Sequence, residues 1–307
     1  MGAEKMRIGG LHFGIQPLEP RANLERRLEW SELLLTSSMV NMKIAICVKQ
    51  VPDSWAEKKM VNGRLDRASV DAVLNDLDEY AIEEALRIVE PLNEGKESPD
   101  HTIPLISMGP DRATEAIRKG LSMGADSGVL VADEALAGSD AIATSKVLAE
   151  VIAKGGFDLV FCGTESTDAR MSVVPAMLAE RLGWAQLTFA GSVKVDVTHS
   201  SVEIARMTES GVETMSANFP CVISVIEKIN EPRYPSFKGI MAAKKKTIEN
   251  RCLADLGISA SEVGASGAWS SVLDAKARPP RDKGIKVEDS GDGGLKLAEF
   301  LAERRLV

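Results

Sequence analysis

From Met42 onward, short apolar runs alternate with longer stretches in which apolar residues recur at helical spacing. The runs "KIAICVK", "HTIPLISMG", "SGVLVAD" and "FDLVFCG" have the length and composition of buried strands. The segments between them, such as "LDEYAIEEALRIVE" and "SDAIATSKVLAEVIAKGG", have the spacing of amphipathic helices. This alternation predicts an α/β fold with a mostly parallel, doubly wound sheet that helices cover on both faces.

The pattern changes after Gly183. The runs "LTFAGSVKVDV", "SSVEIARMT" and "PCVISVIEK" follow one another without a helix between them, which predicts an antiparallel extension of the sheet. Beyond residue 250 the chain is rich in Gly, Pro and Ser until a final helical stretch, "LKLAEFLAERRLV". Because a long structureless segment is unusual inside a compact domain, we expect residues 251–307 to form an extended C-terminal arm that packs on another subunit.

The first 41 residues precede the first strand. They carry Gly and Pro early, followed by a charged stretch that contains leucines. We expect an N-terminal extension that is disordered or adds no core element. Its acidic residues argue against a cleavable targeting peptide; they are Glu4, Glu19, Glu25, Glu29 and Glu32. The predicted organisation is therefore an extension (1–41), an α/β domain (42–250) and an arm (251–307).

Composition narrows the class of function. The chain has 307 residues, of which 44% are hydrophobic, and a formal net charge of -8. That acidic balance argues against nucleic-acid binding. The four cysteines and three histidines lack metal-ligand spacing, so we expect no metal site. No apolar stretch approaches the roughly 20 residues of a membrane helix, which argues against membrane insertion. With no secretory signal in view, we expect a cytoplasmic protein.

Polar residues gather where the predicted strands end. In a parallel sheet, ligands bind beyond the carboxyl ends of the strands. The most informative stretch is "GTESTDARMSVVP" (163–175), in which a strand ends and a polar run leads into a helix. Backbone amides at such a helix start can hold a phosphate. The alternative interpretation is that Ser166, Thr167 and Asp168 only cap the helix.

No catalytic set is recognisable in the sequence. There is no P-loop and no GxGxxG, and no Ser–His–Asp or Cys–His arrangement suggests itself. We therefore expect a protein that carries out no independent catalysis.

A further unusual stretch is "EPRYPSFKGIMAAKKKTIE" (231–249). Its prolines, Pro232 and Pro235, bar a regular helix or a central strand, so the segment is expected to be an exposed loop. It nevertheless carries large apolar residues and ends in three lysines, 244–246. Such a segment either packs back on its own domain or is held for a partner.

Five stretches together resemble the β subunit of electron transfer flavoprotein, including its FixA branch. They are "KIAICVKQVPD", "LNDLDEYAIEEALRIVE", "GPDRATEAIRKGLSMGAD", "RMTESGVETMSANFPCVISV" and "NEPRYPSFKGIMAAKKKTIE". The resemblance runs from Met42 to about residue 260. It implies an adenine-nucleotide α-hydrolase-like fold in a heterodimer with an α subunit, which holds most of one FAD. It also implies a structural AMP in this chain, and electron transfer from flavin dehydrogenases of the acyl-CoA dehydrogenase type to an acceptor of the ETF:quinone oxidoreductase type.

The resemblance also implies site residues. The AMP site would comprise Cys47, Asn75, Asp76, Leu77, Asp78, Met108, Gly163, Thr164, Glu165, Ser166, Thr167, Asp168, Ala169, Arg170, Met171, Ser172, Val173 and Val174. The 231–249 stretch resembles the loop that docks the dehydrogenase, and its contact residues would be Tyr234, Phe237, Ile240 and Met241. Phe237 stands where the family has a leucine-like residue.

Two alternatives remain open from the sequence. In bifurcating members of the family, the nucleotide site of the β subunit holds a second, redox-active FAD, and the loop 163–174 departs from both patterns. A stand-alone adenine-nucleotide-binding module of the universal-stress type would share the fold. Such a module needs neither a docking loop nor a long C-terminal arm.

Overall fold

The computed structural model describes residues 41–61, 64–275, 279 and 284–307. The chain forms two compact units. Of the described residues, the larger one includes 41–58 and Asp66–Ser271, and it contains the sheet and the candidate site. The smaller one, Lys59–Leu65 with Val272–Val307, contains the two-stranded ribbon β3 (Met60–Val61) and β4 (Arg64–Leu65) and the helix α9 (Gly293–Glu303). The expected N-terminal extension lies outside the described residues, apart from Asn41.

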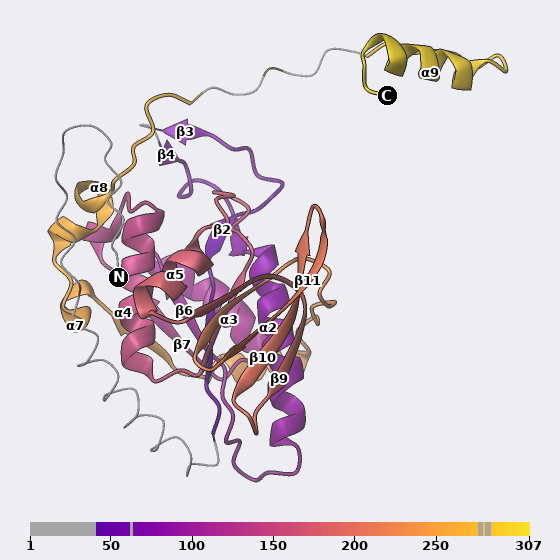
Figure 1. The fold of residues 1–307 in the computed structure, drawn as a ribbon. Helices are drawn as coiled ribbons and strands as arrows, with labels where there is room; N and C mark the ends of the chain where they lie inside the picture. Colours follow the sequence, from indigo (N-terminus) through magenta and orange to yellow (C-terminus); the bar gives the residue numbers. More distant parts are fainter. Residues whose placement is uncertain (1–40, 62–63, 276–278, 280–283) are drawn as a thin grey trace, which may run out of the picture. The chain divides into compact units, whose positions relative to one another are not determined.

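The large unit is built on a nine-stranded sheet with the order β11-β10-β9-β12-β8-β1-β6-β7-β13 (Figure 1). The strands from β9 to β13 in this order are parallel, and β10 and β11 extend the sheet in antiparallel fashion. Their bounds are β1 Ile44–Cys47, β6 Pro104–Met108, β7 Ser127–Val131, β8 Leu159–Gly163, β9 Ala185–Asp196, β10 Ser201–Thr208, β11 Gly211–Asn218, β12 Cys221–Val225 and β13 Ile248–Arg251. The predicted α/β fold is confirmed.

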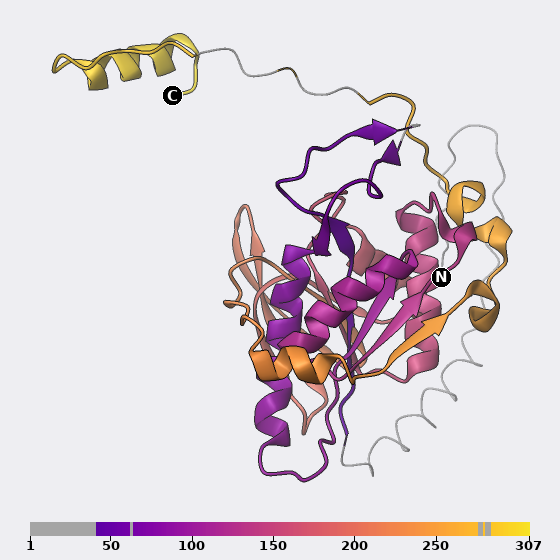
Figure 2. The same ribbon diagram turned by 180° about the vertical axis from the view of Figure 1, so that it is seen from behind.

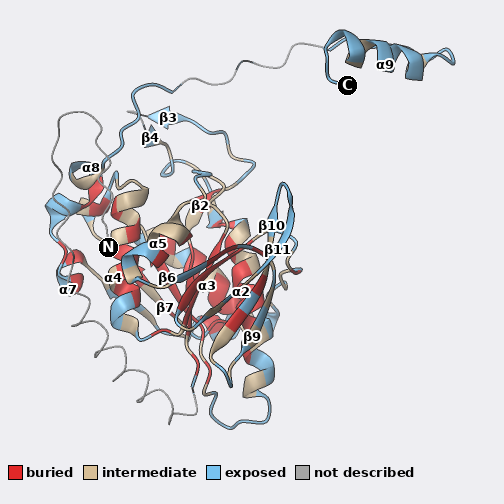
Figure 3. Cartoon of the chain, in the orientation of Figure 1, coloured by how far each residue is buried: buried red, intermediate tan, exposed pale blue. Residues whose placement is uncertain are grey.

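Helices cover both faces of the sheet (Figures 1 and 2). Alternation along β1 sends Ile44 and Ile46 into the core beneath α2 and α3, and Ala45 and Cys47 into the core beneath α4 and α5. Figure 3 shows the buried residues gathered in the sheet and on the sides of the helices that face it. The helices are α2 Asp76–Asn93, α3 Thr114–Met123, α4 Ala141–Gly155, α5 Val174–Leu182, α6 Phe237–Ala243, α7 Leu253–Leu256 and α8 Gly264–Gly267.

Short elements complete the unit. β2 (Gln50–Pro52) pairs with β5 (Ala72–Leu74) in antiparallel fashion. Three 3-10 turns, Asp111–Ala113, Glu134–Leu136 and Ala260–Glu262, lie in the connections. Strand order reverses at β1, because β6 and β7 continue on one side of it and β8 lies on the other. The carboxyl end of β1 is therefore the place where an open α/β sheet offers a crevice.

Two details differ from the expectation. The stretch "CVISV" is not part of the antiparallel extension, because β12 returns to the parallel core between β8 and β9. All five of its residues are buried, as expected for a strand covered on both faces. The expected loop of the docking stretch contains a helix, α6, that begins directly after Pro235 and Ser236.

The predicted boundary between residues 250 and 251 falls inside the large unit. Leu253, Leu256, Ile258 and Val263 are buried in the core under α4. Gly264 has a φ of +63°, and a Cβ there would lie 2.0 Å from the Ala135 carbonyl oxygen, so only glycine allows this close packing. The large unit consequently extends to Ser271, about twenty residues past the predicted boundary.

Candidate functional site

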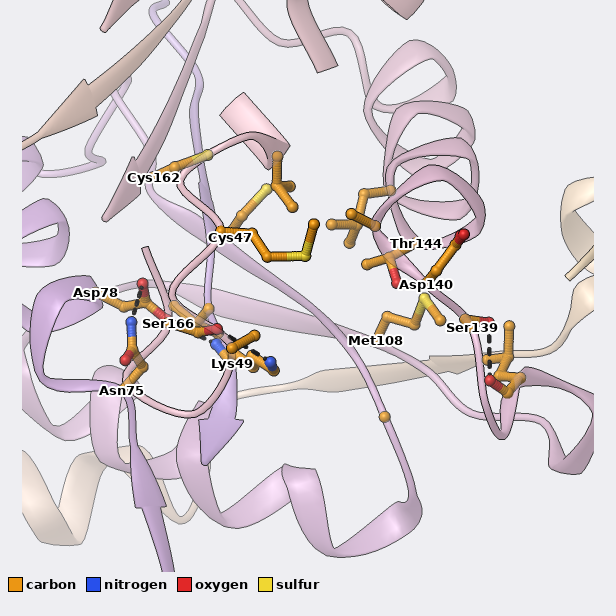
Figure 4. Close-up of a pocket in the computed structure, with 18 of the residues that line it drawn as sticks. Cys47, Lys49, Asn75, Asp78, Met108, Ser139, Asp140, Thr144, Cys162 and Ser166 are labelled. Carbon is orange, nitrogen blue, oxygen red and sulfur yellow. Dashed lines mark hydrogen bonds between the residues drawn. The ribbon is translucent and has the colours of Figure 1, made fainter. Parts of the chain in front are cut away.

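A pocket of about 800 Å³ opens at the carboxyl ends of β1, β6, β7 and β8 (Figure 4). Its walls come from the ends of these strands, the start of α2, the loop 163–174 and the start of α4. The volume lies in the range of about 300–1,000 Å³ that is usual for small-molecule sites. The pocket therefore occupies the position at which the fold binds ligands.

One wall is apolar and contains two thiols. Cys47 and Cys162 are register partners on the neighbouring strands β1 and β8, and both are free and buried. The hydrogen bond with the Cys47 thiol and burial raise the pKa of the Cys162 thiol well above its ordinary value. A thiol held in its neutral form is a poor nucleophile. Together with Val48, Met108 and Leu148, the two thiols form a surface suited to a flat ring.

Asn75 connects the start of α2 to the loop 163–174. Its side chain is buried, and its amide nitrogen donates to Asp78 Oδ1 (2.8 Å) and to the Glu165 carbonyl (2.9 Å). Its Oδ1 accepts from the Thr167 amide at 3.0 Å. Two of these three bonds go to the loop 163–174. Asn75 therefore holds that loop in place and also lines the pocket (Figure 4).

Asp78 is a buried carboxylate at the same corner. Burial raises its pKa to about 7, and N–H donors from Asn75, Lys49 and Gly163 oppose that rise without cancelling it. The Lys49 amide donates to Oδ2 at 2.8 Å. A Cβ on Gly163 would lie 2.7 Å from Asp78 Oδ1 and 2.8 Å from the Leu77 backbone, so the approach of α2 to β8 requires glycine here.

Asp168 does not line the pocket. Its carboxylate is 2% exposed and accepts from Lys49 Nζ (2.7 Å) and from Arg67 Nε (2.8 Å). Burial alone would raise the pKa of Asp168, but Lys49, Ser166 and Arg67 hold it below its ordinary value. Lys49 and Arg67 do line the pocket and supply the positive charge of its described lining. Asp168 thus acts on the pocket through these two cations.

The loop that follows is held in an unusual backbone conformation. Arg170 and Ser172 have φ values of 49° and 55°, in the left-handed region that is uncommon for such residues. Glu165 stabilises both, by accepting from Ser172 Oγ at 2.8 Å and by pairing with Arg170 at 3.5 Å. This conformation places Ser172, Val173 and Val174 in the lining, at the beginning of α5.

The structure brings together most of the predicted pocket residues. Those that line it are Cys47, Asn75, Asp78, Met108, Gly163, Thr164, Glu165, Ser166, Ala169, Met171, Ser172, Val173 and Val174. Those that do not are Asp76, Leu77, Thr167, Asp168 and Arg170. Asp76 and Leu77 lie in the first turn of α2, and Thr167 bonds to Asn75 through its backbone.

The opposite wall was not predicted. It comes from residues 132–148 and includes Asp133. Figure 4 shows Ser139, Asp140 and Thr144 on this wall. Asp140 caps α4 by accepting from the Ala143 amide at 2.9 Å. The sequence contained a pattern that could have predicted this wall. "VADEALAGSDAIA" is also a strand end followed by a capped helix, like the stretch 163–175.

The docking stretch lies away from this pocket. Tyr234 is 93% exposed and Phe237 is 80% exposed, and Ile240 and Met241 are also exposed. Phe237 therefore does not pack into the core of its own domain.

We also searched the described part of the chain for metal sites and membrane-spanning helices. Its His, Cys, Asp and Glu residues form no group of three or more that could hold a metal ion. None of its helices is long and apolar enough to cross a membrane.

Comparison with known proteins is consistent with this architecture. The family model for the electron transfer flavoprotein domain matches residues 62–256. The electron transfer flavoprotein subunit beta of Mycobacterium tuberculosis is 45% identical over 267 residues, which is 86% of this chain and 99% of the relative. The subunit beta of Megasphaera elsdenii is 34% identical (87% and 100% covered), and protein FixA of Azotobacter vinelandii is 34% identical (84% and 92% covered). The predicted resemblance is confirmed, and the chain belongs to the electron transfer flavoprotein β-subunit family.

Proposed function

We propose that this chain is the β subunit of a heterodimeric electron transfer flavoprotein, which passes electrons from flavin dehydrogenases to a downstream acceptor. The observation that carries the proposal is the pocket at the carboxyl edge of the sheet, together with membership of the family. In this role the chain supplies a nucleotide pocket and a docking surface. The α subunit provides most of the FAD site.

The pocket is proposed to bind AMP. The residues fit such a ligand, since an apolar wall at Cys47 and Met108 suits the adenine ring, and the start of α5 at Ser172–Val174 suits the phosphate. Lys49 and Arg67 add positive charge to the lining and favour an anion. AMP would have a structural role, because it would join β1, β8 and the loop 163–174 through one buried ligand.

The docking surface is proposed to bind flavin dehydrogenases of the acyl-CoA dehydrogenase type. Its support is the exposure of Tyr234, Phe237, Ile240 and Met241, all large apolar side chains within eight residues. Electrons would leave toward an acceptor of the ETF:quinone oxidoreductase type. The docking surface and the family match favour this role over that of a stand-alone nucleotide-binding module.

The test is the nucleotide content of the heterodimer purified with its α subunit. Release of bound nucleotides by denaturation, followed by chromatography, is expected to give one FAD and one AMP. Thr144→Trp, which fills the pocket, is expected to remove the AMP and leave the FAD. Thr198→Trp, at an exposed turn, is the matched control and is expected to keep both.

Other outcomes have distinct meanings. Two FAD and no AMP would identify a bifurcating subunit and contradict the AMP assignment. One FAD on the β chain purified alone would contradict the assignment of the flavin to the α subunit.

A further inference from the structure

Helix α6 has its large side chains on the outside. Phe237, Ile240 and Met241 recur at positions i, i+3 and i+4, so they share one face, and all three are exposed. Two small residues, Gly239 and Ala243, face inward. Ala243 is buried, and a Cβ on Gly239 would lie 2.5 Å from the Ser122 carbonyl oxygen of α3. This is the reverse of a helix that packs by its apolar face, and it indicates a surface made for contact with another molecule.

The chain entering α6 is tied to α2 by Arg233. Its guanidinium donates to Glu83 through Nε (2.7 Å) and Nη2 (3.1 Å), and its backbone amide donates to the same carboxylate at 3.2 Å. It also donates to both oxygens of Glu90, at 2.5 and 3.0 Å. The Glu83 side chain is 6% exposed, and such two-pronged pairs are the stronger kind of ion pair.

The chain leaving α6 is tied to α3. Lys246 Nζ donates to the carbonyls of Leu121, Gly124 and Ala125, at 3.3, 3.1 and 2.6 Å. These carbonyls lie at the C-terminal end of α3, where helix carbonyls lack partners and attract cations. Arg118 Nη1 donates to the carbonyls of Ala243 and Lys246, both at 2.6 Å.

We propose that residues 231–246 are a pre-formed docking platform, and that Arg233 and Lys246 are positioning residues that hold Phe237 and its neighbours outward for the partner. This inference rests on the docking role proposed above. A segment already ordered in its bound form loses less conformational freedom when it binds, so its contacts yield more affinity. A loop without such ties would lack this advantage.

The platform also defines the chemistry of its partner. Lys238, Lys244 and Lys245 are exposed beside the apolar face, although the chain as a whole carries a net charge of -8. The complementary surface is an apolar pocket, large enough for an aromatic ring, with carboxylates at its rim. The occupant is the flavin dehydrogenase of the docking role proposed above, and opposite charges at the rim would increase its rate of association.

The experiment compares Arg233→Gln with Arg87→Gln in the heterodimer. Arg87 lies 3.8 Å from the same Glu83, and its ion-pair partner is on α2 and outside the platform, so it is the matched control. Hydrogen exchange of residues 233–243 is expected to speed up about tenfold in Arg233→Gln and to stay unchanged in Arg87→Gln. The KM of the dehydrogenase for the heterodimer is expected to rise about fivefold or more, with kcat within about twofold, because the flavin is untouched.

Two further variants separate the possible failures. Glu90→Gln removes only the more exposed carboxylate and is expected to give a smaller change in the same direction, should Arg233→Gln fold poorly. Phe237→Ala is expected to raise KM without changing hydrogen exchange. If Phe237→Ala raises KM while Arg233→Gln changes neither exchange nor KM, the platform is overturned and the docking role survives. If Phe237→Ala leaves KM unchanged, the docking role fails, and the platform with it.

Discussion

Asp168 and Lys49 form an ion pair at the edge of the candidate pocket, with Lys49 Nζ 2.7 Å from an oxygen of the Asp168 carboxylate, which is almost fully buried. Arg67 approaches the other oxygen to 2.7 Å. One carboxylate thus orients two cations that come from different segments, and both cations line the pocket. Asp168 therefore orients the charged part of the lining without lining the pocket itself.

Asp168→Ala is expected to weaken AMP retention and to lower stability. The variant leaves Lys49 and Arg67 without their shared partner, and both are partly exposed, so water compensates for part of the loss. We expect the variant to lose about 1–2 kcal/mol of unfolding free energy. This value lies between the loss for an exposed ion pair and the loss for a fully buried one. Thermal unfolding and the AMP content after purification provide the measurement. Glu203→Ala, which breaks an exposed pair with Lys194, is the control and is expected to change neither.

The unfolding free energy is expected to depend on pH through Asp78. Its pKa in the folded chain is about 7, above the ordinary value of 3.8. Between these values the folded state keeps a proton that the unfolded state has released, so stability falls as pH rises from about 4 to about 7. The fall is at most about 1.36 kcal/mol per pH unit. Denaturant unfolding gives the unfolding free energy at pH 5 and at pH 7.5. The change between these two pH values is expected to be smaller in Asp78→Asn than in the unmodified protein. An equal change in both proteins would contradict a raised pKa at Asp78.

Phe237→Ala is expected to remove about 2–4 kcal/mol of dehydrogenase binding, the range for an aromatic residue that fills a desolvated pocket. The side chain is 80% exposed, so folding, nucleotide content and assembly with the α subunit are expected to be unchanged. The rate of electron transfer from the dehydrogenase provides the measurement, and chemical reduction by dithionite is the control. Normal electron transfer in this variant would exclude Phe237 as the contact residue.

Lys246 and Lys245 are expected to behave differently, although they are neighbours in one run of three lysines. Lys246→Met removes three bonds to carbonyls at the end of α3 and is expected to cost about 1–2 kcal/mol of stability. Lys245 is exposed, so Lys245→Met is expected to change stability by less than about 0.5 kcal/mol. It is expected instead to slow association with the dehydrogenase at low salt. Chemical denaturation and stopped-flow mixing separate the two effects.

The C-terminal arm is expected to be protected only in the heterodimer. In α9, Leu295 and Leu297 are more than half exposed, and the preceding Lys286 is exposed as well. Trypsin is expected to cleave at Lys286 rapidly in the lone β chain and slowly once the α subunit is bound. Equal cleavage in the two states would show that the arm does not pack on that subunit.

The sequence by itself determined the elements and their class. Buried strands such as β1 and β8 are continuous apolar runs, and α2 has helical periodicity, so local pattern was enough to predict a parallel sheet with a ligand crevice at its carboxyl edge. The docking stretch was also visible, because apolar residues such as Phe237 stood beside prolines and lysines. These signals lie within a few neighbouring residues, where spacing and backbone chemistry act directly.

Only the tertiary structure decided which groups meet. Asp168 bonds to Lys49, which is 119 residues away in sequence, and Arg233 bonds to Glu83, which is 150 residues away. Lys245 and Lys246 are adjacent in one run of lysines, and the sequence does not predict different roles for them. In the structure, Lys246 bonds to the end of α3, whereas Lys245 is exposed. Strand order also came from the fold, since β12 is inserted between β8 and β9 because its two apolar faces both need cover. Pairings between residues so far apart in sequence depend on how the helices pack on the sheet. Local periodicity does not determine that packing.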